Sequence, residues 1–232
     1  MSSEVIMHTL TVSGICKQFR RNKPVLTDVS FSANGGECIG IIGENGSGKS
    51  TLLSIIAGCL KRDAGEIVFD GNSLGKGDFA KSIAYVPQDN PLIEELSVRD
   101  NLRLWYGNDL STIMDGGDDL TGILGIHEFI DEKVKHLSGG MKKRLSIGLA
   151  ASDRQPVILL DEPGAALDLP CKERIGVYLN ARKSRGHIIV IATHEEREIA
   201  LCDRILLLKN GDLNQIDYDG DIHRLVGMLN AG

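Results

Sequence analysis

The sequence has few aromatic residues, no long apolar run and no excess of basic side chains. Aromatic residues make up 4 % of the chain. Its longest strongly apolar stretches, such as 188–192 and 205–208, span about five residues, whereas a membrane-spanning helix needs roughly 20. We therefore expect no transmembrane segment. Glu4 and His8 interrupt the apolar core that a secretion signal would need, so the sequence predicts a cytosolic location.

The charge balance excludes a second class of protein. Lys and Arg number 26 against 32 Asp and Glu, so the formal charge is −6 with histidine neutral. A generic nucleic-acid binder carries a basic surface, because it must neutralise phosphates along the whole contact. We expect no nucleic acid among the partners.

The cysteines form no recognisable framework. They are five in number, an odd count, widely spaced and never in a C-x-x-C pair. Neither a disulfide scaffold nor a zinc site is indicated. We expect them to be small buried hydrophobic residues: Cys16, Cys38, Cys59, Cys171 and Cys202.

Glycine is abundant, with 27 residues, and 42 % of the chain is hydrophobic, enough for a sizeable core. Residues 1–232 are predicted to form a single domain. Turn signals and β-rich runs alternate in the first third, and helical spacing at Val98, Leu102 and Trp105 marks a helical region over about 91–152. The predicted strands of the first third cover 8–12, 25–32, 37–42 and 66–69, and a helix runs from Gly48 to Leu60.

The last third alternates strand, helix and strand. Apolar runs at 157–160, 188–192 and 205–208 are separated by helical patterns, the longer one covering 170–183. Continuously apolar strands are typical of a parallel sheet covered on both faces. The sequence therefore predicts an α/β fold with a parallel sheet flanked by helices.

A phosphate-binding loop lies between the apolar strand at 38–42 and the helix that follows. Nine residues fit G-x-x-x-x-G-K-[ST] and its next position: Gly43, Glu44, Asn45, Gly46, Ser47, Gly48, Lys49, Ser50 and Thr51. The glycines allow backbone N–H groups to converge on an anion at the helix N-terminus. Lys49 would contact the β and γ phosphates, and Ser50 would offer its hydroxyl to Mg²⁺. A glycine-rich turn without a ligand is the alternative for this motif alone.

Two acids follow directly on the apolar strand at 157–160. Asp161 and Glu162 lie where parallel strands end, at the edge where α/β proteins bind ligands. Asp161 suits the shell of Mg²⁺, and Glu162 suits a water attacking the γ phosphate. By itself, an apolar run that ends in Asp-Glu is more often a solvated strand end, but together with the phosphate loop it predicts nucleotide hydrolysis.

Ser138, Gly139 and Gly140 open another predicted helix. Ser138 is a typical N-cap, whereas two glycines in a first helical turn cost about 1 kcal/mol each relative to alanine. They are expected where a phosphate must approach the backbone closely. Lys142, Lys143 and Arg144 are predicted to lie mostly off the apolar face of this helix.

These residues resemble the motifs of the nucleotide-binding subunit of ATP-binding cassette (ABC) transporters. Residues 43–50 and 157–162 are similar to its Walker A and Walker B motifs, and 137–141 to its signature. The remaining elements occur in the family's order: Phe19 as the adenine-stacking aromatic, Gln88 as the Q-loop, Ala166, Leu167 and Asp168 as the D-loop, and His194 as the switch histidine. The likeness covers essentially the whole chain.

The resemblance implies roles for these residues. Glu162, His194 and Gln88 would be catalytic, and Ser50, Gln88 and Asp161 would hold Mg²⁺ beside ATP. The implied fold is a P-loop core with an N-terminal antiparallel β subdomain and an inserted helical subdomain. Three positions depart from the family pattern: Met141 replaces a common glutamine, 164–166 lacks the hydroxyl used for one hydrogen bond across the dimer, and Phe19 replaces tyrosine.

The function implied by the resemblance is ATP hydrolysis coupled to transport. Two ATP-binding subunits, identical or different, would close on MgATP and drive a separate transmembrane permease, whose cytoplasmic helix would dock near Gln88 and Tyr106. The chain would then lie on the inner face of the cell membrane. The sequence around Met141 favours an exporter. A soluble ABC ATPase of iron-sulfur cluster assembly and a non-catalytic nucleotide-binding scaffold are the alternatives.

Overall fold

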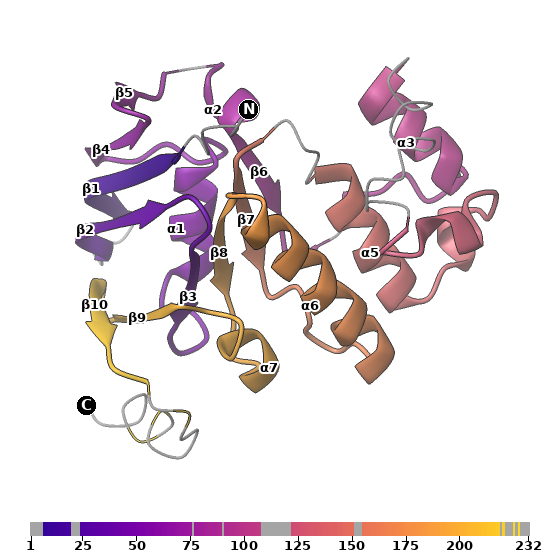
Figure 1. The fold of residues 1–232 in the computed structure, drawn as a ribbon. Helices are drawn as coiled ribbons and strands as arrows, with labels where there is room; N and C mark the ends of the chain where they lie inside the picture. Colours follow the sequence, from indigo (N-terminus) through magenta and orange to yellow (C-terminus); the bar gives the residue numbers. More distant parts are fainter. Residues whose placement is uncertain are drawn as a thin grey trace, which may run out of the picture.

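Two sheets with helices around them make up the described part of the chain. The computed structural model describes residues 7–19, 24–75, 77–89, 91–107, 122–150, 155–218, 220, 225 and 227. The smaller sheet is antiparallel, in the order β2-β1-β4-β5, and lies at the left in Figure 1. Its strands are β1 (Thr9–Gln18), β2 (Pro24–Asn34), β4 (Ala64–Phe69) and β5 (Asn72–Ser73).

The larger sheet has the order β10-β9-β3-β8-β7-β6. The pairs β9·β3, β3·β8, β8·β7 and β7·β6 are parallel, and β10 adds an antiparallel edge. This confirms the predicted parallel core. Its strands are β3 (Cys38–Ile42), β6 (Ile83–Val86), β7 (Val157–Asp161), β8 (Ile188–Ala192), β9 (Arg204–Lys209) and β10 (Asp212–Ile216).

The larger sheet is covered on both faces. Val157 and Leu159 of β7 belong to one apolar cluster, while Ile158 and Leu160 belong to another, since side chains alternate along a strand. The first cluster lies between the two sheets and includes Leu52 and Ile55 of α1 (Lys49–Ile56). The second contains side chains of the helices on the opposite face. Strands buried in this way explain the continuous apolar runs of the sequence.

The helices beyond β6 form the second cover and a lobe beside it (Figure 1). Capping side chains begin two of them: Ser97 accepts from the Asp100 N–H before α3 (Val98–Tyr106), and Asp168 accepts from the Cys171 N–H before α6 (Leu169–Ser184). The other helical elements are α2 (Phe79–Ser82), η2 (Ile126–Phe129), η3 (Val134–His136), α5 (Gly139–Ala150) and α7 (Glu196–Ile199). The helical lobe is confirmed, whereas its exact limits, 91–152, and the single-domain assignment stay predictions.

Several local predictions were wrong. The helix expected to reach Leu60 ends at Ile56, because Ala57 caps it and Gly58 follows with φ 74°. Trp105 was assigned to the apolar face of its helix, but it is 62 % exposed and the neighbouring Tyr106 is buried instead. Strand β10 was not predicted, although Asn210-Gly211 is a hairpin signal. A Gly-Asp-rich segment at 115–119, which the sequence indicates as a break within the helical region, lies outside the described residues.

The expectation for the cysteines holds only in part. Cys38 and Cys171 are buried, Cys16 and Cys202 are half-buried, and Cys59 is exposed. Small thiols fit both environments.

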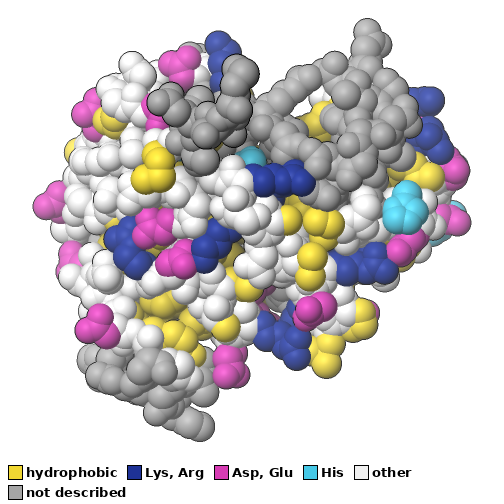
Figure 2. Space-filling view, in the orientation of Figure 1, with side chains coloured by type: hydrophobic (Ala, Val, Ile, Leu, Met, Phe, Trp, Pro, Cys, Tyr) yellow, Lys and Arg dark blue, Asp and Glu magenta, His cyan; other side chains and the backbone are white. Residues whose placement is uncertain are grey.

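The visible surface mixes both signs of charge. In Figure 2, basic and acidic side chains lie next to one another across this face, with apolar side chains between them. Within the described ranges, no helix has the length and apolar character that crossing a bilayer requires.

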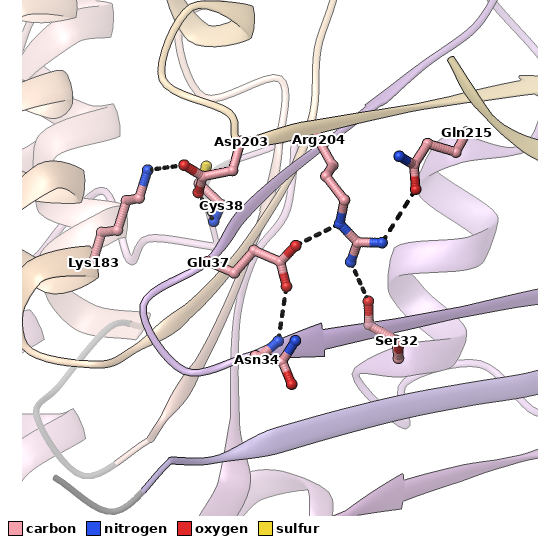
Figure 3. Close-up of polar contacts among 8 residues, drawn as sticks. All are labelled: Ser32, Asn34, Glu37, Cys38, Lys183, Asp203, Arg204 and Gln215. Carbon is pink, nitrogen blue, oxygen red and sulfur yellow. Dashed lines mark hydrogen bonds and ion pairs between the residues drawn. The ribbon is translucent and has the colours of Figure 1, made fainter. Parts of the chain in front are cut away.

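A polar cluster joins β2, β3, β9 and β10 (Figure 3). The guanidinium of Arg204 donates to Glu37, to the Ser32 carbonyl and to Gln215. Glu37 also accepts a 2.9 Å hydrogen bond from the Asn34 N–H. The two sheets are therefore connected by a largely desolvated ion pair as well as by apolar packing.

Replacing Glu37 with glutamine should lower the free energy of unfolding by about 1–3 kcal/mol, because Arg204 would lose its charged partner in a partly buried position. Urea denaturation monitored by circular dichroism measures the change. Asp131→Asn removes a solvent-exposed ion pair with Arg99 and should cost less than about 1 kcal/mol. Equal losses in the two variants would contradict a special contribution of the Glu37–Arg204 pair.

Candidate functional site

The predicted phosphate loop connects β3 to α1, as the sequence indicated. Gly48 precedes α1 with φ 108°, a conformation that L-residues rarely adopt, and a Cβ there would lie 2.8 Å from Val25 Cγ1. A Cβ on Gly43 would lie 2.4 Å from the Leu208 carbonyl oxygen. Glycine is therefore required at both positions by the chain's own packing.

Lys49 is folded into the loop it follows. Its Nζ donates to the carbonyl oxygens of Gly43 at 2.7 Å and Glu44 at 3.1 Å. Burial lowers the pKa of this ammonium, and the carboxylates of Glu162 and Asp161 act in the opposite direction. The arrangement places a positive charge at the base of the loop, close to the two acids of β7.

Asp161 ends β7 and is 2 % exposed. Its Oδ1 is buried and has no hydrogen-bond partner among the described residues. Burial raises the pKa of this carboxyl, while a hydrogen bond from Ser50 and the charge of Lys49 act against the increase. A buried acceptor without a partner, beside a hydroxyl, is a donor set that fits a divalent cation with oxygen ligands.

Glu162 contacts both of the other residues predicted to be catalytic, Gln88 and His194. Its Oε2 accepts a 3.0 Å hydrogen bond from Gln88 Nε2, and its Oε1 lies 3.5 Å from Nδ1 of His194. The backbone of Glu162 has φ 47° and its N–H donates to the Ala192 carbonyl at 2.8 Å. The main chain thus turns sharply after β7 and directs the carboxylate toward Gln88 and His194.

A pocket of about 420 Å³ surrounds these groups. Ten of its eleven lining residues were predicted, and Val25 of β2 was not. The predicted residues are Phe19, Asn45, Gly46, Gly48, Lys49, Ser50, Thr51, Gln88, Glu162 and His194. Gly43, Glu44 and Ser47 belong to the loop but do not line the pocket. Val25 has no motif signal, since an apolar residue in a strand is ordinarily assigned to the core.

The predicted signature and D-loop residues do not line this pocket. Ser138 accepts a 3.2 Å hydrogen bond from the Met141 N–H, which confirms it as a helix cap, and a Cβ on Gly139 would meet nothing within 4 Å. Asp168 caps α6, while Ala166 is exposed and Leu167 packs against the apolar cluster on the α5 and α6 side of the sheet. The backbone at Gly139 is therefore open to a second molecule.

Lys143 is the main functional candidate that the sequence missed. It was expected on the outer side of its helix, yet it is 4 % exposed and its Nζ donates to Pro87 and Gln88 carbonyl oxygens at 3.1 and 2.9 Å. Helical periodicity places a lysine in solvent because the side chain is polar. The sequence pattern therefore could not indicate the contact of Lys143 with the Pro87 and Gln88 carbonyls.

Comparison with known proteins identifies the family. A family model described as ABC transporter matches residues 26–165. The chain belongs to the ABC transporter family. The Nod factor export ATP-binding protein I of Rhizobium sp. (strain N33) is 34 % identical over 209 residues, which cover 87 % of this chain and 68 % of that protein. The lipopolysaccharide export system ATP-binding protein of Escherichia coli (strain K12) is 32 % identical over 216 residues, 89 % of each chain.

The fold comparison agrees. A dimeric ATP-binding cassette in a post-hydrolysis state, bound to ADP and Pi, has a TM-score of 0.76 and 27 % identity, covering 90 % of this chain and 99 % of that one. The ABC chain described here is a nucleotide-binding ATPase with the P-loop fold that the sequence predicted.

Changing Gly48 to alanine should weaken ATP binding at least about tenfold, because the strained φ and the contact with Val25 displace the loop predicted to bind phosphate. Fluorescent ATP-analogue titration measures the dissociation constant. Gly71→Ala is the matched control, since Gly71 has φ 77° but a Cβ there meets nothing within 4 Å. It should lose about 1 kcal/mol of stability and bind ATP normally. Unchanged binding by Gly48→Ala would contradict the assignment of the loop.

Glu198 connects the segments that carry His194 and Glu162. It accepts hydrogen bonds from the Thr193 hydroxyl and from the Gly164 N–H, at the ends of β8 and of the turn after β7. Burial raises the pKa of its carboxyl to about 7, opposed chiefly by the hydrogen bond from Thr193. The unfolded chain ionises this carboxyl near 4.5, so the folded state binds the extra proton between about pH 4.5 and pH 7.

The contribution of Glu198 to stability should therefore be complete below about pH 4.5 and decrease as the pH rises through 7. Glu198→Gln removes the titration, and the stability of this variant relative to the wild type should increase by up to about 3 kcal/mol between pH 5 and pH 8. Guanidinium denaturation of both proteins across this range provides the measurement. Parallel stability profiles would show that Glu198 is ionised in the folded state throughout.

Proposed function

We propose that this ABC ATPase dimerises on MgATP and powers substrate export through a separate membrane permease. The observation that carries the proposal is the division of the predicted nucleotide site. One pocket holds the phosphate loop, Glu162, Gln88 and His194, whereas the signature glycines lie outside it on the same chain. In this proposal a complete nucleotide site forms only when a second subunit places its signature glycines against the nucleotide in this pocket.

Glu162 acts as the base in this proposal. Its carboxylate, held between Gln88 and His194, accepts the proton of the water that attacks the γ phosphate. Lys49 balances charge on the β and γ phosphates. Phe19, 47 % exposed at the mouth of the pocket, offers its ring to adenine.

Ser50, Asp161 and Gln88 would hold Mg²⁺. The partnerless Oδ1 of Asp161 and the Ser50 hydroxyl beside it supply oxygen ligands, and Gln88 adds its amide oxygen. When bound, the ion neutralises charge on the phosphates and orients them for in-line attack. Gln88 would thereby contact both the base and the cation shell.

The start of α5 provides the second half of the site. Ser138 accepts from the Met141 and Lys142 N–H groups, which leaves those of Gly139 and Gly140 as the donors without a partner within the helix, and the missing Cβ at Gly139 leaves space for an anion to approach. ATP bound in the pocket of one subunit would meet this helix end of its partner, so the γ phosphate joins the two subunits. ADP lacks that phosphate, and hydrolysis would release them.

The permease would contact the helical lobe. Leu104 and Trp105 of α3 are 63 % and 62 % exposed, and Ile93 precedes the helix with half of its surface in solvent. Tyr106, the residue expected at this contact, is buried, and its hydroxyl donates to the carbonyls of Gly148 and Leu149. Trp105 is therefore the better candidate for the docking surface, which would place the chain on the inner face of the cell membrane.

Export is favoured by the relatives. Those named for Nod factor export and for lipopolysaccharide export both match over more than four fifths of this chain. We therefore prefer transport to iron-sulfur cluster assembly.

Replacing Glu162 with glutamine tests the mechanism. The variant should bind ATP as the wild type does, hydrolyse it at least about 100-fold more slowly because the base is lost, and elute as a dimer with MgATP in size-exclusion chromatography. Lys49→Ala should fail to bind ATP and remain monomeric. An ATP-bound Glu162→Gln protein that stays monomeric would contradict the dimer, and undiminished hydrolysis would contradict the role of Glu162.

A further inference from the structure

Lys143 is a buried cation that forms no ion pair with any carboxylate of the described residues. Its Nζ instead donates to the backbone carbonyls of Pro87 and Gln88. Burying an ammonium costs several kcal/mol unless hydrogen bonds compensate. A lysine in this position is expected to have a role that a neutral side chain cannot fill.

The contact joins two parts of the ATPase site. Lys143 lies one helical turn beyond Gly139 and Gly140 on α5, so all three residues belong to the same helix. Gln88, whose carbonyl oxygen lies 2.9 Å from Lys143 Nζ, uses its side chain to donate to Glu162. A continuous path of hydrogen bonds therefore leads from the signature helix through Gln88 to the proposed base.

The carboxylates around Lys143 oppose the effect of burial on its pKa. Burial lowers the pKa of Lys143, whereas Asp161, Asp89, Glu198 and Glu162 all favour its charged form. The two accepting carbonyls belong to successive residues, and an ammonium can donate to both at once. Lysine thereby fixes the main chain at Gln88 in a way that methionine, of similar length, cannot.

We infer that Lys143 is a positioning residue for ATP hydrolysis: it fixes the main chain at Gln88, so that the helix carrying the signature glycines and the Gln88 side chain move together. The inference rests on the proposed roles of Gln88 and Glu162. It adds that docking of the signature on a partner's nucleotide is transmitted within the same subunit to Gln88. Lys143 does not itself line the pocket and contacts it only through the main chain of Gln88.

The neighbouring Lys142 provides a matched control. It lies on the same turn of α5, but its ammonium pairs with Glu94 at 2.5 Å on the surface. Lys142→Met changes the net charge and the helix propensity as Lys143→Met does, without touching the Q-loop. We expect Lys142→Met to retain the wild-type kcat.

Lys143→Met should lower kcat for ATP about tenfold or more, since a small displacement of a catalytic side chain is sufficient for such a loss. The dissociation constant for ATP should change by less than about twofold, because no pocket residue is altered. Lys143→Arg, which keeps the charge and the donors, should recover most of kcat. ATPase assays and fluorescent-nucleotide titration give the two constants, and thermal melts verify folding. An unchanged kcat, a loss confined to ATP affinity, or a failure of arginine to improve on methionine would overturn the inference.

A double-mutant cycle with Gln88→Ala separates positioning from a general structural role. If Lys143 acts through Gln88, Lys143→Met should reduce kcat by less than about twofold in the Gln88→Ala background. Losses that multiply would overturn the inference while leaving the proposed function intact. Full activity of Glu162→Gln would instead defeat the proposed function itself. If Lys143→Met does not fold, Lys143→Gln, which can donate to one of the two carbonyls, replaces it in the same cycle with the same criteria.

Discussion

Parallel pairing of β3, β8, β7 and β6 brings four distant segments of the chain to one edge of a sheet. Val86 pairs with Leu160, and Asp161 pairs with Ala192. Gln88 lies two residues beyond Val86, Glu162 lies two residues beyond Leu160, and His194 lies two residues beyond Ala192. The same edge receives the phosphate loop from β3. Without this register the groups of the site would not meet, and everything proposed for its chemistry depends on it.

Most of the fold and the pocket could be predicted because they follow from local patterns. Continuous apolar strands, a glycine-rich turn before a helix and acids at a strand end each have a cause within a few residues of the chain. What could not be predicted depends on contacts between distant segments. The burial of Lys143 requires the Pro87 and Gln88 carbonyls beside α5, and the exchange of Trp105 for Tyr106 at the core depends on the Gly148 and Leu149 carbonyls. Helical spacing alone indicates neither of these contacts.

The site also shows how polar groups are distributed in a largely apolar interior. Lys49, Lys143 and Asp161 are all buried, and in each of them burial shifts the pKa against the charged form while nearby opposite charges act in the other direction. Such a set is costly to assemble, and the apolar clusters on both faces of the sheet must offset that cost. The same few strands therefore determine both the stability of the fold and the geometry of the candidate site. Substitutions in this region are expected to affect both.

Glu162 occupies a left-handed backbone conformation, which costs an ordinary residue about 1 kcal/mol or more. The hydrogen bond from its N–H to the Ala192 carbonyl holds the main chain in this conformation. The main chain at Glu162 is thus fixed, and its carboxylate can change position only by rotation about the side-chain torsions. The proposed base therefore needs little reorganisation of its main chain in order to act, since folding already provides this conformation.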